Sequence, residues 1–361
     1  MPTTTRTSKP FETAQSTDIS STDRAASEAP TSAIVTIGGG SGLSVLLRGL
    51  KVWVGGPIRE LTAVVTVSDD GGSSGRLRRE FGILPPGDIR SCIVALADDE
   101  DLLARLFQYR FDEGEGLSGH SFGNLFLTAL AGITGDFYEA ILTAEAVLSV
   151  RGRILPATLS DLRLHAKGLS GRTYEGESAV GGSGEPLQEI LLEPEAPPGF
   201  GPAIEAIRQA DLVVLGPGSL YTSVIANLLI PDIDAAIRES RGKVVLPLNL
   251  MTQSGETEGM SALDHLDAIE RYLGSGAIDT VVVNTARLPK ESLPAYREEG
   301  SEPVMVDDEA FRQRGIEVVG DDLLAEGKLI RHDRFKLARA ILSVLKPEDA
   351  AEVDAGVKLA E

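Results

Sequence analysis

The sequence predicts an α/β protein built on a doubly wound, mostly parallel sheet. Short apolar runs rich in β-branched residues alternate along the chain with amphipathic, helix-like segments. The apolar runs show no polar alternation, which is typical of strands buried on both faces of a parallel sheet. Loops of glycine and small polar residues follow these runs. Such loops line the carboxyl edge of the sheet, where open α/β sheets bind their ligands.

Five runs are predicted strands, at residues 33–37, 62–67, 212–215, 243–246 and 280–284. The first helix is predicted from the apolar series over residues 43–50. Asp88 follows a Pro-Pro-Gly turn, and we expect it to cap a helix that runs to Ala97. Asp136, with Glu139 three residues later, predicts a capped helix that ends near residue 150.

The predicted organisation is one α/β nucleotide-binding domain over residues 33–347. Residues 1–32 are rich in Ser and Thr and lack periodicity, so we expect a disordered tail. Residues 168–202 are rich in Gly, Pro and Glu and are interpreted as a loop-rich insertion with two short strands, within the domain and not as a separate one. Residues 348–361 are polar, which predicts a flexible C-terminal tail.

Composition limits the function classes. The 361 residues contain 34 Lys+Arg and 54 Asp+Glu, a net charge of −20. This charge repels phosphate backbones and anionic headgroups, so we expect no nucleic-acid partner. The single cysteine excludes an internal disulfide and a thiolate-rich zinc site. No apolar run is long enough to span a bilayer, so we expect a cytoplasmic protein without membrane insertion.

The first glycine loop is a candidate phosphate site, formed by Gly38, Gly39, Gly40, Ser41 and Gly42. Backbone N–H groups of glycines at a helix start can approach an anion closely. A dinucleotide fingerprint fails because Leu43 or Val45 stands where its third glycine is needed, and no lysine completes a P-loop. The glycine spacing therefore argues against an NAD-type oxidoreductase, which is the third and least supported hypothesis for the function. A tight turn that simply requires small residues is the structural alternative.

The next loop adds a second group of candidate ligand residues, Asp69, Asp70, Gly71, Gly72, Ser73 and Arg76. Arginines 76, 78, 79 and 90 form a local basic cluster in an acidic chain, and guanidinium groups suit a diphosphate. The aspartates can hold a ribose or a divalent cation. The alternative is an Asp-capped turn and a solvated helix face.

His120 and Asn124 lie four residues apart and can share one helix face, either toward a ligand or in a cap. A glycine turn after the third strand supplies the candidates Gly216, Gly218, Ser219, Leu220 and Tyr221. There we expect Ser219 to cap the following helix, whose N–H groups offer a second anion site. His332 is interpreted as a surface or capping residue.

Asn249, Thr252 and Gln253 follow the next strand. Their side chains can read a nucleobase edge or sugar hydroxyls, or they can close loops by bonding backbone groups. The sequence contains no nucleophile elbow and no Cys–His pair. No metal-like histidine spacing occurs, so no metal site is assigned.

These blocks together carry a family resemblance. The chain resembles the gluconeogenesis factor family (YvcK-like), within the CofD-like superfamily. The matching stretches are IVTIGGGSGLSVLLRGLK, TAVVTVSDDGGSSGRLRREFGILPPGDIRSCIVALAD, GHSFGNLFLTAL, ILPAT, ADLVVLGPGSLYTSVIANLL, NLMTQSGETEG and HDRFKLARAI. The resemblance implies a Rossmann-like, CofD-like fold with a nucleotide-type ligand across the strand ends.

The resemblance also implies a function. YvcK-like proteins look like binders of nucleotide sugars, UDP-N-acetylglucosamine in particular. They are linked to cell shape and cell-wall growth on gluconeogenic carbon, through a regulatory partner that the sequence does not identify. The CofD branch implies instead a magnesium-dependent transfer of phospholactate from a nucleotide donor. The Ser68–Arg76 loop has the YvcK-like form, so we favour a regulator with no required cofactor and no turnover. Exposed strand edges and the apolar helix at 219–230 leave room for a homo-oligomer.

Overall fold

The computed structural model describes residues 32–98 and 102–345. The predicted tails lie outside the described residues, except that Ser32 already belongs to the first strand.

The centre of the molecule is a seven-stranded sheet in the order β10-β9-β8-β7-β1-β2-β3. Every neighbouring pair in it is parallel. Its strands are β1 (Ser32–Gly38), β2 (Ile58–Val65), β3 (Arg153–Pro156), β7 (Leu212–Leu215), β8 (Lys243–Pro247), β9 (Thr280–Asn284) and β10 (Glu317–Asp321). The chain first adds strands on one side of β1 and then on the other, so the doubly wound, mostly parallel fold is confirmed.

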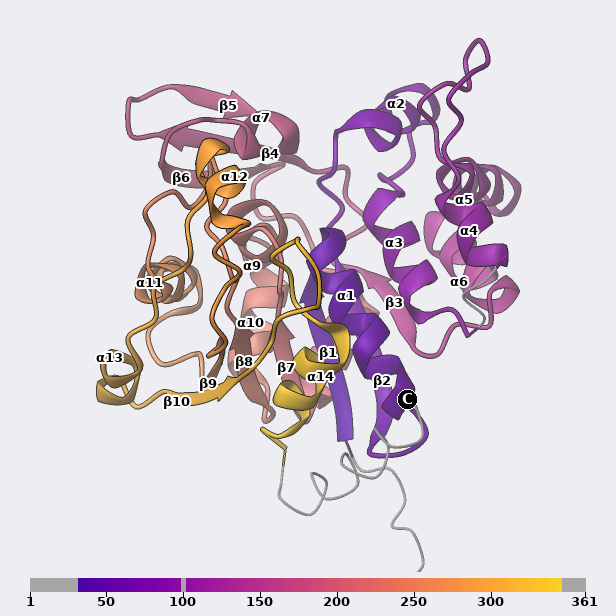
Figure 1. The fold of residues 1–361 in the computed structure, drawn as a ribbon. Coiled ribbons are helices and arrows are strands. Elements are labelled where there is room, and N and C mark those ends of the chain that lie inside the picture. Colours follow the sequence, from indigo (N-terminus) through magenta and orange to yellow (C-terminus); the bar gives the residue numbers. More distant parts are fainter. Residues whose placement is uncertain (1–31, 99–101, 346–361) are drawn as a thin grey trace, which may run out of the picture.

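Helices cover both faces of this sheet (Figure 1). On one face α1 packs against α3 and α14, and on the other α8 packs against α10, β1 and β3. The α-helices are α1 (Gly40–Leu50), α2 (Gly72–Phe81), α3 (Gly87–Leu96), α4 (Leu102–Gln108), α5 (Phe122–Thr134), α6 (Phe137–Val147), α7 (Glu177–Gly181), α8 (Gly201–Gln209), α9 (Ala226–Leu228), α10 (Pro231–Glu239), α11 (Ala262–Leu273), α12 (Leu293–Glu298), α13 (Asp308–Gln313) and α14 (Arg334–Leu342). A 3-10 turn, η1 (Lys51–Trp53), and a π-helix, η2 (Leu220–Ile225), complete the helical elements.

The sequence of α1 explains its position. Leu43, Leu46, Leu47 and Leu50 recur at helical spacing and are fully buried between the sheet and the neighbouring helices. A Cβ at Gly49 would lie 2.0 Å from the carbonyl oxygen of Arg334, so only glycine lets α14 cross α1 this closely. The start of α1 follows the carboxyl end of β1 directly, with only Gly39 between them.

A small antiparallel sheet, β5-β4-β6, lies beside the main sheet and carries α7 (Figure 1). Its strands are β4 (Arg163–Gly168), β5 (Thr173–Glu175) and β6 (Leu187–Glu193). Residues 168–202, expected to be a loop-rich insertion, thus supply β5, α7 and β6, while most of β4 precedes them. The insertion is held to the β2 loop because Asp70 accepts hydrogen bonds from the N–H and hydroxyl of Ser178.

One local prediction was wrong. Asp88 does not cap α3, because the residue before the helix is Pro86 and Asp88 lies in the first turn. The helix expected over 219–230 is present over residues 220–228, with π geometry in η2 and α geometry in α9. The cap at Asp136 is confirmed by its side chain, which accepts a hydrogen bond from the N–H of Glu139. Strands β3 and β10 had not been predicted.

Within the described ranges, no single helix is long and apolar enough to cross a membrane. Residues 220–228 and 231–239 reach that length only as a pair bent by 79°.

Candidate functional site

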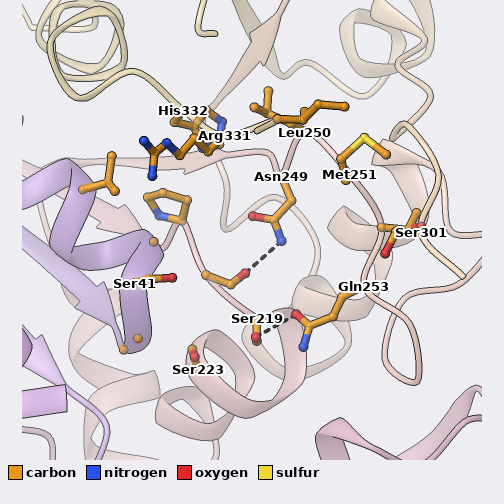
Figure 2. A pocket seen from close by; sticks show the side chains of 18 of the residues that line it. Ser41, Ser219, Ser223, Asn249, Leu250, Met251, Gln253, Ser301, Arg331 and His332 are labelled. Carbon is orange, nitrogen blue, oxygen red and sulfur yellow. Dashed lines mark hydrogen bonds between the residues drawn. The ribbon is translucent and has the colours of Figure 1, made fainter. Parts of the chain in front are cut away.

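A pocket of about 540 Å³ opens at the carboxyl ends of β1, β7 and β8 (Figure 2). Strand order reverses between β1 and β7, and this switch point is where open α/β sheets bind ligands. Its lining comprises Gly39, Gly40, Ser41, Gly42, Val45, Pro217, Gly218, Ser219, Ser223, Asn249, Leu250, Met251, Thr252, Gln253, Tyr296, Ser301, Ile330, Arg331 and His332.

The start of α1 forms one wall. Gly40 has φ +67°, a backbone conformation that favours glycine, and a Cβ at Gly42 would lie 2.5 Å from the carbonyl oxygen of Pro217. The residue before the helix, Gly39, has no side chain that could cap it. Among the described residues, the N–H groups of Ser41 and Gly42 have no hydrogen-bond partner. This wall therefore offers free backbone donors at the positive end of a helix dipole.

The turn between β7 and η2 forms the adjacent wall, and it differs from what the sequence predicted. The N–H of Tyr221 and the hydroxyl of Thr222 both donate to the buried carboxylate of Glu256, at 3.3 and 3.1 Å. A protein carboxylate thus already occupies the helix start where we expected a second anion site. Ser219 does not cap η2, because its hydroxyl donates instead to Oε1 of Gln253 at 2.8 Å.

The loop after β8 forms the third wall. Nδ2 of Asn249 donates to the carbonyl oxygen of Gly218 at 2.8 Å (Figure 2). Since a carbonyl only accepts, this bond fixes the amide orientation and leaves Oδ1 of Asn249 as an acceptor. Thr252 lines the pocket, and its hydroxyl joins this loop to the segment after α12 because it accepts from the N–H of Glu302 at 2.8 Å.

A segment distant in sequence forms the fourth wall. Residues 322–333, here called the C-terminal strap, run from β10 to α14 and bring Ile330, Arg331 and His332 to the pocket. Tyr296 holds the strap in place, since its hydroxyl accepts from the N–H of Ile330 at 3.0 Å. His332, expected to be a surface or capping residue, is half-buried and lines the pocket. Its burial lowers its pKa to about 4, so it is neutral at physiological pH.

The charge of the lining is unusual for this protein. None of the lining residues is an Asp or Glu, although the chain carries a net charge of −20. Arg331 supplies the only permanently charged side chain of the lining. Its guanidinium has no ion-pair partner among the described residues. A cationic side chain beside free helix N–H groups is the chemistry that binds phosphate.

The remaining predicted site residues lie outside this pocket. Those not in its lining are Gly38, Asp69, Asp70, Gly71, Gly72, Ser73, Arg76, His120, Asn124, Gly216, Leu220 and Tyr221. His120 and Asn124 both bond the hydroxyl of Ser73 and so join α2 to α5. Arg76 donates to the carbonyl oxygen of Ser118. Most of these polar contacts connect elements of the protein to one another.

A group of carboxyl side chains lies behind the α1 wall. A Cβ at Gly39 would meet Oδ2 of Asp88 at 2.4 Å, and the N–H of Gly40 donates to the Asp88 carboxylate. Burial and the nearby Asp69 raise the pKa of Asp88 to about 6. Burial also raises the pKa of Glu177, whose Oε2 accepts from Ser68 at 3.0 Å. In the part of the chain that the structure describes, no three His, Cys, Asp or Glu residues are arranged to hold a metal ion.

Sequence reasoning missed Tyr296, Arg331 and His332 as pocket residues. They come from the last fifth of the chain and follow no glycine loop, so no local pattern marks them. The only signal was the HDRFKLARAI block, which contains His332.

Comparison with known proteins places this geometry in context. A protein-family model described as 2-phospho-L-lactate transferase CofD matches residues 34–324. The gluconeogenesis factor of Bacillus subtilis is 46% identical over 314 residues, which cover 87% of this chain and 98% of that protein. The gluconeogenesis factor of Halalkalibacterium halodurans is 44% identical over 321 residues, covering 89% and 98%. The crystal structure of a UPF0052 family member from Bacillus halodurans superposes with a TM-score of 0.81 at 45% identity, covering 86% of this chain and 99% of that one.

Proposed function

The chain belongs to the CofD family and, within it, to the gluconeogenesis factors, and from this premise we propose that it is a cytoplasmic nucleotide-sugar-binding regulator. The ligand we propose is a UDP-sugar of the UDP-N-acetylglucosamine type. The observation that carries the proposal is the carboxylate-free pocket at the switch point of a strongly acidic protein.

The α1 wall and Arg331 are the proposed phosphate position. The N–H groups of Ser41 and Gly42 lie at the positive end of the helix dipole, which attracts negative charge. The guanidinium of Arg331 can bind phosphate oxygens through two N–H groups. A pocket of about 540 Å³ is within the usual size range of small-molecule sites.

The loop after β8 carries an acceptor. Oδ1 of Asn249 has no partner among the described residues, so it suits a ligand N–H such as the imino group of uracil. Donors on the α1 wall suit the diphosphate of a nucleotide sugar, which only accepts hydrogen bonds, and an acceptor beyond β8 suits its base.

The proposed activity is regulatory. The polar groups of the pocket wall provide hydrogen bonds and charge, and the one histidine of the lining, His332, is neutral. We therefore propose that ligand occupancy is reported to a protein of the cell-wall machinery during growth on gluconeogenic carbon. The names of the relatives support the gluconeogenic part of this role.

A second candidate is a transferase of the CofD type, favoured by the carboxyl groups behind the α1 wall. A carboxyl with a pKa of about 6, as at Asp88, can accept a proton from an alcohol acceptor near neutral pH. The described residues do not fit a protein-held magnesium site, because Asp69 accepts from the N–H of Gly71 and Asp70 from Ser178. We therefore derive no step through a metal.

Calorimetric titration of UDP-N-acetylglucosamine into the full chain, with and without magnesium, tests both candidates. The regulator binds saturably, and mass analysis recovers the nucleotide sugar unchanged after prolonged incubation. Absence of binding would remove this ligand from the proposal. A nucleotide product formed in the presence of an alcohol acceptor would establish the transferase instead.

A further inference from the structure

Three side chains, joined by hydrogen bonds, lead from the pocket wall into the protein interior. The hydroxyl of Ser219 donates to Oε1 of Gln253 at 2.8 Å (Figure 2), and Nε2 of Gln253 donates to Oε1 of Glu256 at 3.3 Å. Ser219 and Gln253 line the pocket, whereas Glu256 does not. Only 2% of the Glu256 surface is exposed, so Glu256 connects to the pocket through the hydrogen bonds of Gln253 and Ser219 and not by direct contact with a ligand.

At the Glu256 end of this hydrogen-bonded series, the groups that donate and accept hydrogen bonds are fixed, and we call this order its polarity. Its carboxylate accepts from the backbone N–H of Tyr221 and from the hydroxyl of Thr222. Backbone N–H groups only donate, so the group facing them must accept. Burial raises the pKa of Glu256, while the hydrogen bonds from Tyr221 and Thr222 favour its charged form. A charged carboxylate has no hydrogen to give.

This polarity determines the orientation of the next two groups. Gln253 must present its amide N–H to the carboxylate, which places its carbonyl oxygen toward Ser219. The Ser219 hydroxyl must then donate its single hydrogen to that oxygen. What Ser219 offers to the pocket is therefore a lone pair, which accepts a hydrogen bond and repels a phosphate oxygen.

We propose that Glu256 is a positioning residue that sets the hydrogen-bond polarity of the pocket at Ser219, so that this corner accepts a hydroxyl group from the sugar part of the ligand. The inference rests on the proposed function and assigns a part of the ligand to one corner of the pocket.

The position of Ser219 identifies the group it meets. It follows Gly218 directly, and a Cβ at Gly218 would lie 3.4 Å from the carbonyl oxygen of Gly39. A Cβ at Gly40 would lie 3.9 Å from the hydroxyl of Ser223, in the same turn of chain. The corner is thus next to the α1 wall that we assign to phosphate. In a nucleotide sugar the groups attached to the phosphates are the two sugars, which carry hydroxyls.

Glu256→Gln tests the polarity because it reverses it. The new amide must still give its oxygen to the N–H of Tyr221, so its NH₂ group faces Gln253. Gln253 then turns its own oxygen toward residue 256 and its NH₂ toward Ser219. The Ser219 hydroxyl accepts from Gln253 and is free to donate into the pocket.

The probes are UDP-N-acetylglucosamine and analogues in which each sugar hydroxyl in turn is replaced by fluorine, which cannot donate. In the unmodified protein at about pH 8, we expect one analogue to bind about fivefold to tenfold more weakly than the parent, the effect of one hydrogen bond. In Glu256→Gln this ratio falls, because fluorine can weakly accept the hydrogen that Ser219 then donates, and Ser219→Ala abolishes it. The matched control is Glu258→Gln, which removes the same charge from an exposed residue of the same loop and keeps the ratio.

The outcomes separate the inference from the proposed function. If Glu256→Gln weakens the parent and every analogue by the same factor, Glu256 is only structural and the inference is wrong. The same conclusion follows if no fluorinated analogue shows a penalty that Ser219→Ala removes, a test that stands even where Glu256→Gln does not fold. If the unmodified protein binds none of these compounds, the proposed function itself fails.

Discussion

Arg331 is the residue on which the electrostatics of the pocket depend. Its guanidinium has no ion-pair partner within the described ranges, and it lines a pocket without carboxylates. A charged hydrogen bond contributes roughly 1.5–3 kcal/mol. We therefore expect Arg331→Ala to weaken UDP-N-acetylglucosamine binding about tenfold to a hundredfold in calorimetry. Arg331→Lys restores part of the loss, because an ammonium keeps the charge without the bidentate geometry.

The matched control is Arg241→Ala, which removes an exposed arginine just before β8, at the opposite edge of the sheet. Equal losses in the two variants would mean that overall charge, and not the position of Arg331, governs binding.

The raised pKa of Asp88 predicts how the stability of the folded protein depends on pH. Its pKa lies at about 6 in the folded protein against 3.8 ordinarily, so the folded state holds this proton more tightly. The stabilisation from the protonated form is complete below about pH 4 and is lost as pH rises toward 6. At about 1.4 kcal/mol per pKa unit, the charged form costs up to about 3 kcal/mol at neutral pH.

We expect Asp88→Asn to remove that cost, because the amide is neutral and can still accept from the N–H of Gly40. Urea unfolding should show a stability gain of about 1–3 kcal/mol at pH 7 that shrinks toward zero near pH 4. Comparing the variant with the unmodified protein cancels the titration of Glu145, whose pKa is also raised. The variant also lowers the pKa of Glu177, because the Asp88 charge is one cause of its raised pKa, and this adds to the gain near neutral pH. A gain that does not change with pH would show that Asp88 is not the titrating group.

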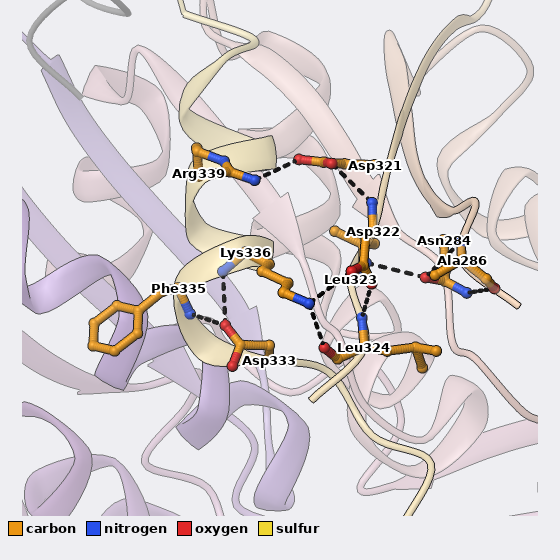
Figure 3. Close-up of polar contacts among 10 residues, drawn as sticks. All are labelled: Asn284, Ala286, Asp321, Asp322, Leu323, Leu324, Asp333, Phe335, Lys336 and Arg339. Atoms are coloured by element: carbon orange, nitrogen blue, oxygen red, sulfur yellow. Dashed lines mark hydrogen bonds and ion pairs between the residues drawn. The ribbon is translucent and has the colours of Figure 1, made fainter. Parts of the chain in front are cut away.

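At the scale of elements, the C-terminal strap depends on contacts at its base (Figure 3). Nζ of Lys336 donates to Asp322 at 2.7 Å and to the carbonyl oxygen of Leu324 at 2.9 Å. Oδ1 of Asn284, at the end of β9, accepts from the N–H of Leu323 at 3.0 Å. These bonds tie the strap to α14 and to the sheet, and so determine where Arg331 lies.

Lys336→Met should therefore weaken ligand binding about threefold to tenfold while the core stays folded, because two exposed or half-buried hydrogen bonds contribute only about 1 kcal/mol each. Hydrogen exchange should accelerate in residues 322–333 and remain unchanged in β1. The control is Lys243→Met, which breaks an exposed pair with Glu317 at the other edge of the sheet. Unchanged exchange in the strap would contradict its dependence on Lys336.

Elements with a strong local signal could be predicted from the sequence. Residues 212–215 and 280–284 coincide with β7 and β9, since uninterrupted apolar runs between turn residues leave little choice. The strand at Glu317–Asp321 escaped prediction because it is polar and lies at a sheet edge. The bond between the N–H of Tyr221, in η2, and Glu256 could not be foreseen either, because the two residues come from different loops.

At the scale of the whole molecule, the sheet topology makes some of the site predictable. The loops after β1, β7 and β8 converge because parallel strands end at one edge, so Gly40, Ser219 and Asn249 could be placed together. The β2 loop ends at the same edge, yet Asp70 lines a different cavity, of about 340 Å³, against the insertion. Which side of β1 a loop faces depends on strand order, which local sequence patterns do not encode. The strap position likewise depends on tertiary contacts.

The net charge of −20 predicts how salt affects binding. At low ionic strength the field of the whole protein reaches about 30 Å and repels an anionic nucleotide sugar, whereas at about 0.15 M salt the screening length is about 8 Å. Charged groups that contact the ligand within the pocket are separated from it by less than either screening length, so salt weakens their attraction much less. Salt should therefore raise the association rate constant of a fluorescent UDP-sugar about twofold to threefold in stopped-flow experiments and leave its dissociation rate constant nearly unchanged.

The control ligand for this experiment is uridine, which is uncharged and should associate at the same rate at both salt concentrations. A nucleic-acid-binding surface behaves in the opposite way, because salt weakens its attraction for phosphate. If the UDP-sugar associated more slowly at high salt, the local field of Arg331 would have to extend beyond the pocket and outweigh the acidic surface. That result would contradict the view that ligands reach a carboxylate-free pocket against the field of the protein.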